Sequence, residues 1–122
     1  MINYQIKDAS FIISDTVSDQ VIWQGKPYDC PVTKILPIAS QKGCIVLLDY
    51  YQFSKSEYRA IGNLLFLNSA GEIKWTAETP TPSDSYIDFH NQGRKIHATS
   101  WDGYFVEIDP ANGKILNKIL GH

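Results

Sequence analysis

The sequence contains one structural unit that occurs three times. Two clear copies, Asn63–Trp75 and Tyr104–Asn117, each consist of an apolar run, an Asn or Asp, a short turn that includes a glycine, and a second run. A weaker copy without the glycine spans Phe11–Trp23. Gly71 and Gly113 stand where a tight turn requires a positive φ, which glycine adopts without steric cost. Internal repeats of this kind are typical of folds that stack one supersecondary unit upon the next.

The spacing of the copies indicates the size of the stacked unit. Trp23 and Trp75 fall at the same point of the repeat, and Asn117 occupies that point in the last copy. Trp75 and Asn117 are about 42 residues apart, within the usual length of a four-stranded propeller blade. The interval from Trp23 to Trp75 is about 52 residues, because residues 52–61 form an insertion. The predicted units span about residues 1–25, 30–78 and 86–120.

Short β-branched and aromatic runs, separated by Gly, Pro, Asn and Asp, predict eleven strands. Their predicted bounds are Asn3–Ile6, Phe11–Ser14, Val21–Gln24, Thr33–Ala39, Cys44–Tyr51, Asn63–Asn68, Ile73–Ala77, Tyr86–His90, Lys95–Ser100, Tyr104–Ile108 and Ile115–Ile119. A helix of one or two turns is predicted only at Ser54–Ile61. The strand count of the first unit, three or four, is left open by the sequence.

Two turn segments carry a resemblance to a known family. Asp109–Lys114 and Asn68–Trp75 are similar to the repeat of quinoprotein-type (PQQ-like) β-propellers, in which a strand, an Asp, a Gly-Lys turn and a Trp follow one another. The resemblance implies propeller-type blades, with Trp23 and Trp75 docked against a neighbouring sheet. Complete members of that family bind a cofactor inside a closed ring. About three units are too few to close a ring, so no cofactor site is carried over.

The expected fold is therefore all-β, with two and a half to three antiparallel four-stranded blades in an open stack, not a closed ring. Residues 1–122 are predicted to form a single domain. Cys44–Leu48 and Leu64–Leu67 are apolar at every position, which indicates strands covered on both faces. The middle unit should therefore lie between the other two.

The last unit has one apolar and one polar face. With Gln92-Gly93 at the hairpin tip, strand alternation places Ile87, Phe89, Ile96 and Ala98 on the apolar face. The polar face should carry Tyr86, Asp88, His90, Lys95, His97 and Thr99. Asp88, His90 and His97 are of the types that bind zinc or iron. The alternative, an exposed polar strand face, is preferred because the sequence supplies no fourth ligand, so no metal is predicted.

Composition and charge exclude several functional classes. The net charge of −2 lacks the basic excess of nucleic-acid or anionic-membrane surfaces. No segment approaches the roughly 18 consecutive apolar residues of a membrane span. Met1–Asp8 has neither the basic nor the apolar region of a signal peptide, so a cytoplasmic location is expected. Cys30 and Cys44 are accordingly expected to be free thiols.

The insertion is the main candidate for function. Its flanks and body carry Tyr50, Tyr51, Phe53 and Tyr58 within nine residues, and tyrosine is enriched in protein interfaces. The alternative is that these rings cap an open end of the sheet stack. Trp101, in a turn between strands, is either a contact residue or a lid on the core. The predicted partner contacts are Tyr50, Tyr51, Phe53, Glu57, Tyr58, Trp101 and Asp102.

No nucleophile elbow, phosphate loop or suitably spaced carboxylate pair occurs in the sequence, so an enzyme is not expected. The preferred hypothesis is a non-enzymatic protein-binding module, in form similar to immunity proteins that neutralise a cognate bacterial toxin. One alternative is a homo-oligomeric structural unit, because two copies of three blades could form a six-bladed ring. The other is a small-molecule or glycan binder that uses its aromatic rings as stacking platforms.

Overall fold

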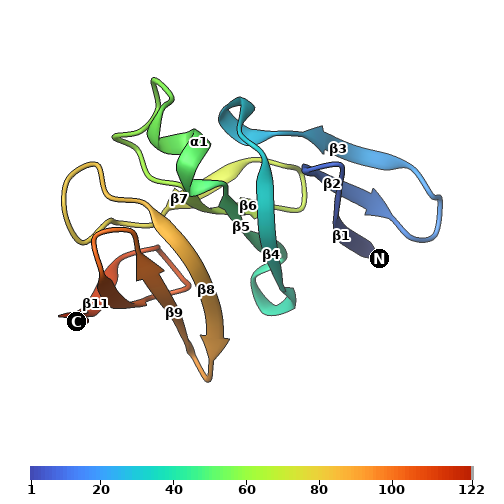
Figure 1. Ribbon diagram of the computed structural model, residues 1–122. Helices are drawn as coiled ribbons and strands as arrows, with labels where there is room; N and C mark the ends of the chain where they lie inside the picture. The colour runs from blue at the N-terminus through green and yellow to red at the C-terminus, as the bar shows by residue number, and fades with distance from the viewer. Residues whose placement is uncertain (122) are drawn as a thin grey trace.

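The chain folds into three antiparallel sheets that lie side by side (Figure 1). The computed structural model describes residues 1–121, and His122, the last residue of the predicted domain, lies outside this range. The first sheet contains β1 (Ile2–Lys7), β2 (Ser10–Asp15) and β3 (Val21–Gly25). The second contains β4 (Val32–Ile38), β5 (Gly43–Leu48), β6 (Leu64–Asn68) and β7 (Ile73–Thr76). The third contains β8 (Tyr86–Gln92), β9 (Lys95–Ser100), β10 (Tyr104–Ile108) and β11 (Ile115–Leu120).

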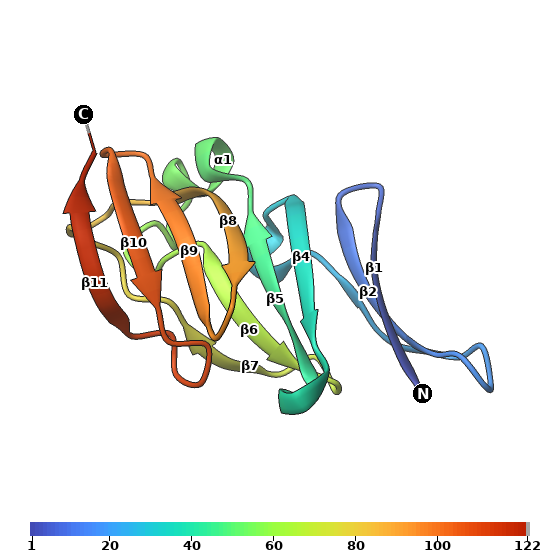
Figure 2. The ribbon, with the colours of Figure 1, turned by 90° about the horizontal axis from the view of Figure 1, so that it is seen from below.

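The sheets form an open stack with the second sheet in the middle, and the two chain ends lie at opposite ends of the stack (Figure 2). Within residues 1–121 the sheets do not close into a ring, as the sequence predicted. All eleven predicted strands are present, with ends displaced by a few residues. Trp23 and Trp75 both lie in the last strand of their sheets. The first sheet therefore lacks the strand that opens the other two.

A β-bulge recurs at the same place in each sheet and confirms the alignment of the repeats. The register shifts between Ile13 and Ser14, between Phe66 and Leu67, and between Glu107 and Ile108. In each case the residue just before the bulge faces the repeat position, which is Trp23, Trp75 or Asn117. Because a bulge bends its strand and increases the local twist, the three hairpins share one shape.

The turns that follow β2, β6 and β10 are built alike. Asp15, Asn68 and Asp109 each accept a hydrogen bond through the side chain from the backbone N–H two residues later, at 2.9–3.0 Å. Such Asx turns imitate a backbone turn and explain why Asn or Asp follows each strand. Gly71 and Gly113 then adopt φ values of 87° and 77°. Asp19 takes the corresponding place in the first turn with φ of 61°, a conformation that Asp tolerates better than most residues.

Two hydrophobic clusters hold the stack together, one on each face of the middle sheet. On β5, Ile45 and Leu47 pack toward the third sheet, whereas Cys44, Val46 and Leu48 pack toward the first. Strand β6 alternates in the same way. All residues of β5 are buried, which explains their uninterrupted apolar character and confirms the prediction that this sheet is covered twice.

A tryptophan ring packs on a turn glycine at each junction between sheets. The Trp23 ring lies against Gly71, and the Trp75 ring lies against Gly113, where an added Cβ would meet ring atoms at 2.5 Å. The Trp75 indole N–H also donates to the carbonyl of Pro110 at 3.1 Å. Glycine is therefore required at each of these turns for two reasons: the backbone adopts a positive φ, and the tryptophan ring leaves no room for a Cβ.

One face assignment in the third sheet was wrong at its first two residues. Tyr86 pairs with Ser100 and Asp88 with Thr99, so Ile87 is an extra residue in a bulge. The bulge turns Tyr86 into the core, where it is fully buried, and leaves Ile87 exposed. Beyond the bulge the alternation holds. Phe89, Ile96 and Ala98 are buried, as predicted.

The helix was predicted in the wrong place. Helix α1 spans Tyr50–Ser54, because the Asp49 side chain caps it by accepting from Gln52 N–H at 2.9 Å. Strand β5 accordingly ends at Leu48, not at Tyr51. The serines that suggested a helix instead end it, since the hydroxyls of Ser54 and Ser56 donate to carbonyls three residues earlier.

Short 3-10 turns also occur at Pro27–Asp29 and Ala39–Gln41. None of the helices in residues 1–121 has the length and apolarity needed to cross a membrane.

Gly113→Ala should destabilise the protein more than Gly93→Ala does. Both glycines have positive φ, 77° and 69°, but a Cβ at Gly93 would meet nothing within 4 Å. Both variants therefore lose about 1–2 kcal/mol to backbone strain. Gly113→Ala should lose a further ~1–3 kcal/mol because the Trp75 ring must move. Urea unfolding followed by circular dichroism measures both losses, and equal losses would show that the ring does not dock on this glycine.

Candidate functional site

The insertion between β5 and β6 is anchored by rings that face inward. Phe53 is fully buried in the cluster between the first and second sheets, with its ring centroid 6.2 Å from that of Tyr28. Tyr58 is half-buried and packs on Tyr28 at 4.8 Å. The Glu57 carboxylate beside it raises the pKa of the Tyr58 hydroxyl. Phe53 was therefore wrongly predicted as a partner contact, because burial leaves it no surface to offer.

Two rings just before the insertion, at the start of helix α1, lie toward the surface. Tyr51 is 58% exposed, and the Lys55 ammonium lies 3.9 Å from its ring centroid while also donating to its hydroxyl. Tyr50 stacks on Trp101, with ring centroids 5.1 Å apart and planes 24° from parallel. Trp101 is 64% exposed. Tyr50, Tyr51 and Trp101, termed the aromatic patch below, thus come together although Trp101 lies far away in the sequence.

Backbone and side-chain hydrogen bonds fix the segments that carry the aromatic patch. The backbone N–H of Trp101 donates to the backbone carbonyl of Ser85 at 2.7 Å. The buried Asn63 side chain donates to the carbonyls of Leu48 and Tyr86 and accepts from Tyr86 N–H, all at 2.8–2.9 Å. Asn63 therefore joins the end of β5, the start of β6 and the start of β8. Asp102, beside Trp101, is exposed and accepts from the Thr81 hydroxyl at 2.7 Å.

A small cavity lies within the aromatic patch. Its volume is about 190 Å³, and it is lined by Tyr50, Tyr51, Ser54, Ser83, Ser85 and Trp101. Ligand sites for drug-sized molecules usually measure ~300–1,000 Å³, so this cavity fits one side chain better than a whole ligand. The three serines were not identified from the sequence, because they follow no motif. Ser54 ends helix α1, and Ser83 and Ser85 lie in an irregular segment.

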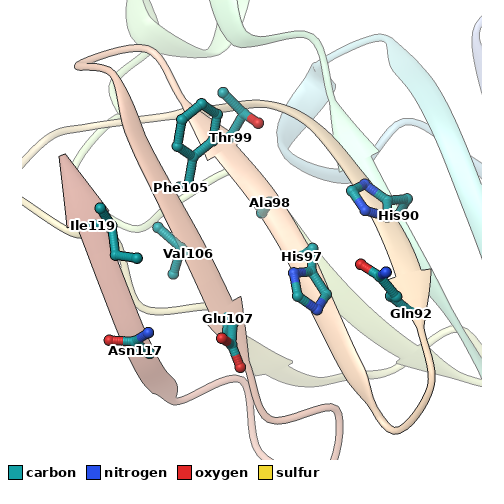
Figure 3. Close-up of a pocket in the computed structure, with 10 residues that line it drawn as sticks. All are labelled: His90, Gln92, His97, Ala98, Thr99, Phe105, Val106, Glu107, Asn117 and Ile119. Atoms are coloured by element: carbon teal, nitrogen blue, oxygen red, sulfur yellow. The ribbon is translucent and has the colours of Figure 1, made fainter. Parts of the chain in front are cut away.

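The outer face of the third sheet carries a second, shallower pocket with a volume of about 320 Å³ (Figure 3). One row of directly paired residues crosses all four strands and consists of His90, His97, Glu107 and Asn117. The two imidazoles stack with centroids 5.5 Å apart. The next row contains Phe105 and Ile119, which are more than half exposed. This face is the one that a further sheet of the stack would cover.

The charged groups of this face are paired with lysines. The Lys34 ammonium donates to the Asp88 carboxylate at 2.9 Å and to the carbonyl of Phe89, and so links β4 to β8. The bond from Lys34 holds the pKa of Asp88 below its ordinary value. Lys95 likewise bonds Glu107 at 2.8 Å and lowers the pKa of that carboxyl. Across residues 1–121, no group of three or more His, Cys, Asp or Glu side chains is placed to hold a metal ion.

Both cysteines are free and buried. Burial raises the pKa of the Cys44 thiol to about 12 and that of the Cys30 thiol to about 11. A thiol with so high a pKa is protonated near neutral pH, whereas thiol nucleophiles act as thiolates. Both cysteine side chains pack in the hydrophobic cluster between the first and second sheets.

The family of the chain follows from its sequence over almost its whole length. A family model described as "Domain of unknown function (DUF7957)" matches residues 1–120. This chain belongs to that family. No curated protein matches the sequence.

Several solved structures share the fold of this DUF7957 chain. The computationally designed Ika4 protein is 14% identical with a TM-score of 0.66, and the match covers 99% of this chain and 68% of that one. The computationally designed Ika8 protein is 13% identical with a TM-score of 0.63, covering 99% and 33%. BamB from Moraxella catarrhalis is 13% identical with a TM-score of 0.56, covering 97% and 35%.

These matches confirm the PQQ-like blade fold that the turn segments suggested, because BamB is a PQQ-like β-propeller protein. The DUF7957 chain spans about a third of the length of Ika8 and of BamB. At such low identity the likeness concerns the fold alone.

Lys34→Met should raise the pKa of Asp88 toward the ordinary value of about 3.9, because the ammonium that favours the carboxylate is lost. A carboxyl whose pKa is lowered on folding stabilises the protein above its unfolded pKa, and this contribution disappears as the pH falls through the folded pKa. The stability gap between wild type and variant should thus be at most about 1 kcal/mol near neutral pH, since the pair is exposed, and should shrink in acid.

Carbon-13 NMR titration of the Asp88 carboxyl measures this pKa directly. Lys95→Met is the matched control, because it removes the partner of Glu107 and leaves Asp88 unaffected. An Asp88 pKa that is the same in wild type and Lys34→Met would contradict the role of the β4–β8 link.

Proposed function

We propose that this chain is a non-enzymatic protein-binding module that contacts its partner through the aromatic patch. The observation that carries the proposal is the stack of Tyr50 on Trp101 beside the exposed Tyr51. Aromatic residues dominate interface hot spots, since they bury much area at low entropic cost. A large ring held open to solvent contributes less to folding than a buried one, so a contact role accounts for its exposure better than a structural role does.

Preorganisation supports the same proposal. The Trp101 ring is held by its stack on Tyr50, and its backbone is held by Ser85. Side chains that are fixed before binding lose less conformational entropy when a partner arrives, which raises affinity. Tyr58 and Phe53 contribute from below by anchoring the insertion, and Glu57 and Asp102 are polar groups suited to the rim.

Trp101→Ala should weaken partner binding by about 30-fold, as expected for loss of a hot-spot residue. Tyr51→Ala should act in the same direction. Ile119→Ala is the matched control, because Ile119 is similarly exposed but lies on the outer face of the third sheet. Affinity capture with each variant as bait, followed by mass spectrometry, identifies proteins retained by wild type and Ile119→Ala and lost with Trp101→Ala. Loss with Ile119→Ala alone would place binding on the other face.

In its most specific form, the proposal is that this chain is an inhibitor that neutralises a cognate bacterial toxin. It rests on a mild acidic charge and on a sequence without a catalytic motif. A toxin gene beside the gene for this chain identifies the protein to test. Co-expression should then restore growth to cells that produce the toxin, and Trp101→Ala should abolish the rescue while Ile119→Ala retains it. Equal rescue by wild type and Trp101→Ala would contradict the assignment of the patch.

A further inference from the structure

Strand β1 has one edge without a neighbouring strand. The recurrent bulge shows that β1, β5 and β9 take the same place in their sheets. On this side β5 pairs with β4 and β9 pairs with β8, whereas β1 pairs with β2 alone. Every residue of β5 is buried, but every residue of β1 except Tyr4 is exposed. The repeat therefore defines an open position for a fourth strand beside β1.

The hydrogen bonds of β1 show which backbone groups face this open edge. Residues opposite each other in antiparallel strands alternate between pairs that exchange hydrogen bonds and pairs that do not. The Met1 carbonyl accepts from Thr16 N–H at 2.8 Å, which fixes the alternation along β1. The N–H and C=O groups of Ile2, Tyr4 and Ile6 therefore point away from β2. No backbone partner for these groups occurs within residues 1–121.

The corresponding edges of the other two sheets are protected. On β8, the backbone N–H and carbonyl of Tyr86 both bond to the Asn63 side chain. On β4, Val32 N–H donates to the Ala9 carbonyl at 2.8 Å, and Pro37 has no N–H to offer. Proteins protect exposed strand edges in such ways because unpaired backbone groups attract other chains. The edge of β1 has no proline, so it is open to a further strand.

A cavity lies beside the first half of β1. Its volume is about 360 Å³, within the ~300–1,000 Å³ that is usual for ligand sites. Residues 1–4 line one side, and Pro37, Ala39 and Gly43 of the second sheet are among those that line the other. Both ribbon views place β4 next to β1 (Figures 1 and 2). The cavity therefore lies between the open edge and the second sheet.

The second sheet shows what fills the equivalent space. Tyr4 pairs with Ile13 and Ile45 pairs with Phe66, and both partners precede the recurrent bulge. Ile45 pairs in turn with Leu36 of β4, whose side chain packs in the cluster between the second and third sheets. A fourth strand of the first sheet would likewise place an apolar side chain opposite Tyr4, toward the second sheet.

We propose that an extended segment of a protein partner binds antiparallel to β1 and supplies the fourth strand of the first sheet. Its backbone pairs with Ile2, Tyr4 and Ile6, and its alternate apolar side chains enter the cavity. The row of donors and acceptors selects an extended peptide, because a strand repeats the same spacing along its length.

The open edge favours a separate partner over a second copy of the chain. Within residues 1–121 all eleven strands already belong to a sheet, so another copy has no spare strand to donate. The open edge and the aromatic patch share no residue. This inference therefore goes beyond the proposed function and does not rest on it.

A peptide titration tests the pairing without a known partner. The probe copies residues 31–39, which include β4, because β4 takes this position against β5. It is titrated into the full chain labelled with nitrogen-15. The Tyr4 and Ile6 amide signals should shift along a saturable curve, and their hydrogen exchange should slow by about tenfold as both N–H groups gain partners. The Asn3 and Gln5 amides, which already bond to β2, should change little in exchange rate.

Two methylated peptides distinguish strand pairing from other binding. A methyl group on the amide at the Leu36 position blocks a donor that would face β1, and it should weaken binding by about tenfold or more. A methyl group at the Ile35 position should leave binding unchanged, because that amide faces away from β1. The two peptides have the same composition. Equal affinities, or no shift of the Tyr4 and Ile6 signals, would overturn the proposal.

A pair of proline variants assigns the binding to β1. Ile6→Pro removes one N–H from the open edge and leaves the hydrogen bonds with β2 in place, so the peptide should bind about tenfold more weakly. Gln24→Pro on β3, at the other edge of the same sheet, is the matched control and should bind as wild type does. Equal binding by the two variants contradicts the assignment. If Ile6→Pro fails to fold, the methylated peptides decide the question on the wild-type chain.

Sedimentation distinguishes a second copy from a separate partner. Wild type should remain a monomer at the concentration of the titration. A dimer that Ile6→Pro converts to monomers would show that β1 pairs with another copy, which overturns the proposal.

The strand site and the aromatic patch can fail separately. Trp101→Ala should bind the peptide as wild type does, because Trp101 lies on the third sheet. A failed peptide titration refutes the strand site and leaves the patch standing. A partner that Trp101→Ala retains refutes the patch and leaves the strand site standing.

Discussion

The packing of a tryptophan ring on a turn glycine sets the distance between neighbouring sheets, and the rest of the structure depends on it. Trp23 on Gly71 joins the first sheet to the second, and Trp75 on Gly113 joins the second to the third. With these contacts in place, the two faces of the middle sheet meet apolar faces at close-packed distance. Each cluster then consists mainly of side chains from the two adjacent sheet faces, and Phe53 of helix α1 completes the one between the first and second sheets.

The aromatic patch inherits its geometry from the same junctions. Tyr50 begins helix α1, which follows β5 of the second sheet, and Trp101 lies in a turn of the third sheet. Their stack therefore exists only if these two sheets keep one fixed arrangement. Asn63 reinforces this relation by bonding to the ends of strands from both sheets. A site assembled across a sheet junction is as rigid as the junction, which suits the recognition of a partner by preformed contacts.

The strands and their stacking were predictable because repetition and apolar alternation are local properties of a sequence. Departures from regularity were not. A single extra residue at Ile87 reverses the orientation of Tyr86, and nothing in the composition of this strand marks the bulge. Phe53 and Tyr51 belong to the same aromatic run, yet one is buried and the other exposed, because a short helix started by Asp49 sets their directions. Ser83 and Ser85 reach the aromatic patch through contacts between distant segments, so the sequence pattern contained no sign of them.

The two ends of the stack differ from its interior in the parts that join sheets. The third sheet carries Asn117 where a ring would reach forward to a further glycine, and the first sheet carries Asp19 where a glycine would receive a ring from behind. Between two copies of this chain, the contact that joins the sheets within one copy would lack both its ring and its glycine. The tryptophan–glycine contact therefore has a direction along the stack, and in residues 1–121 neither end sheet carries the half of the contact that would face outward.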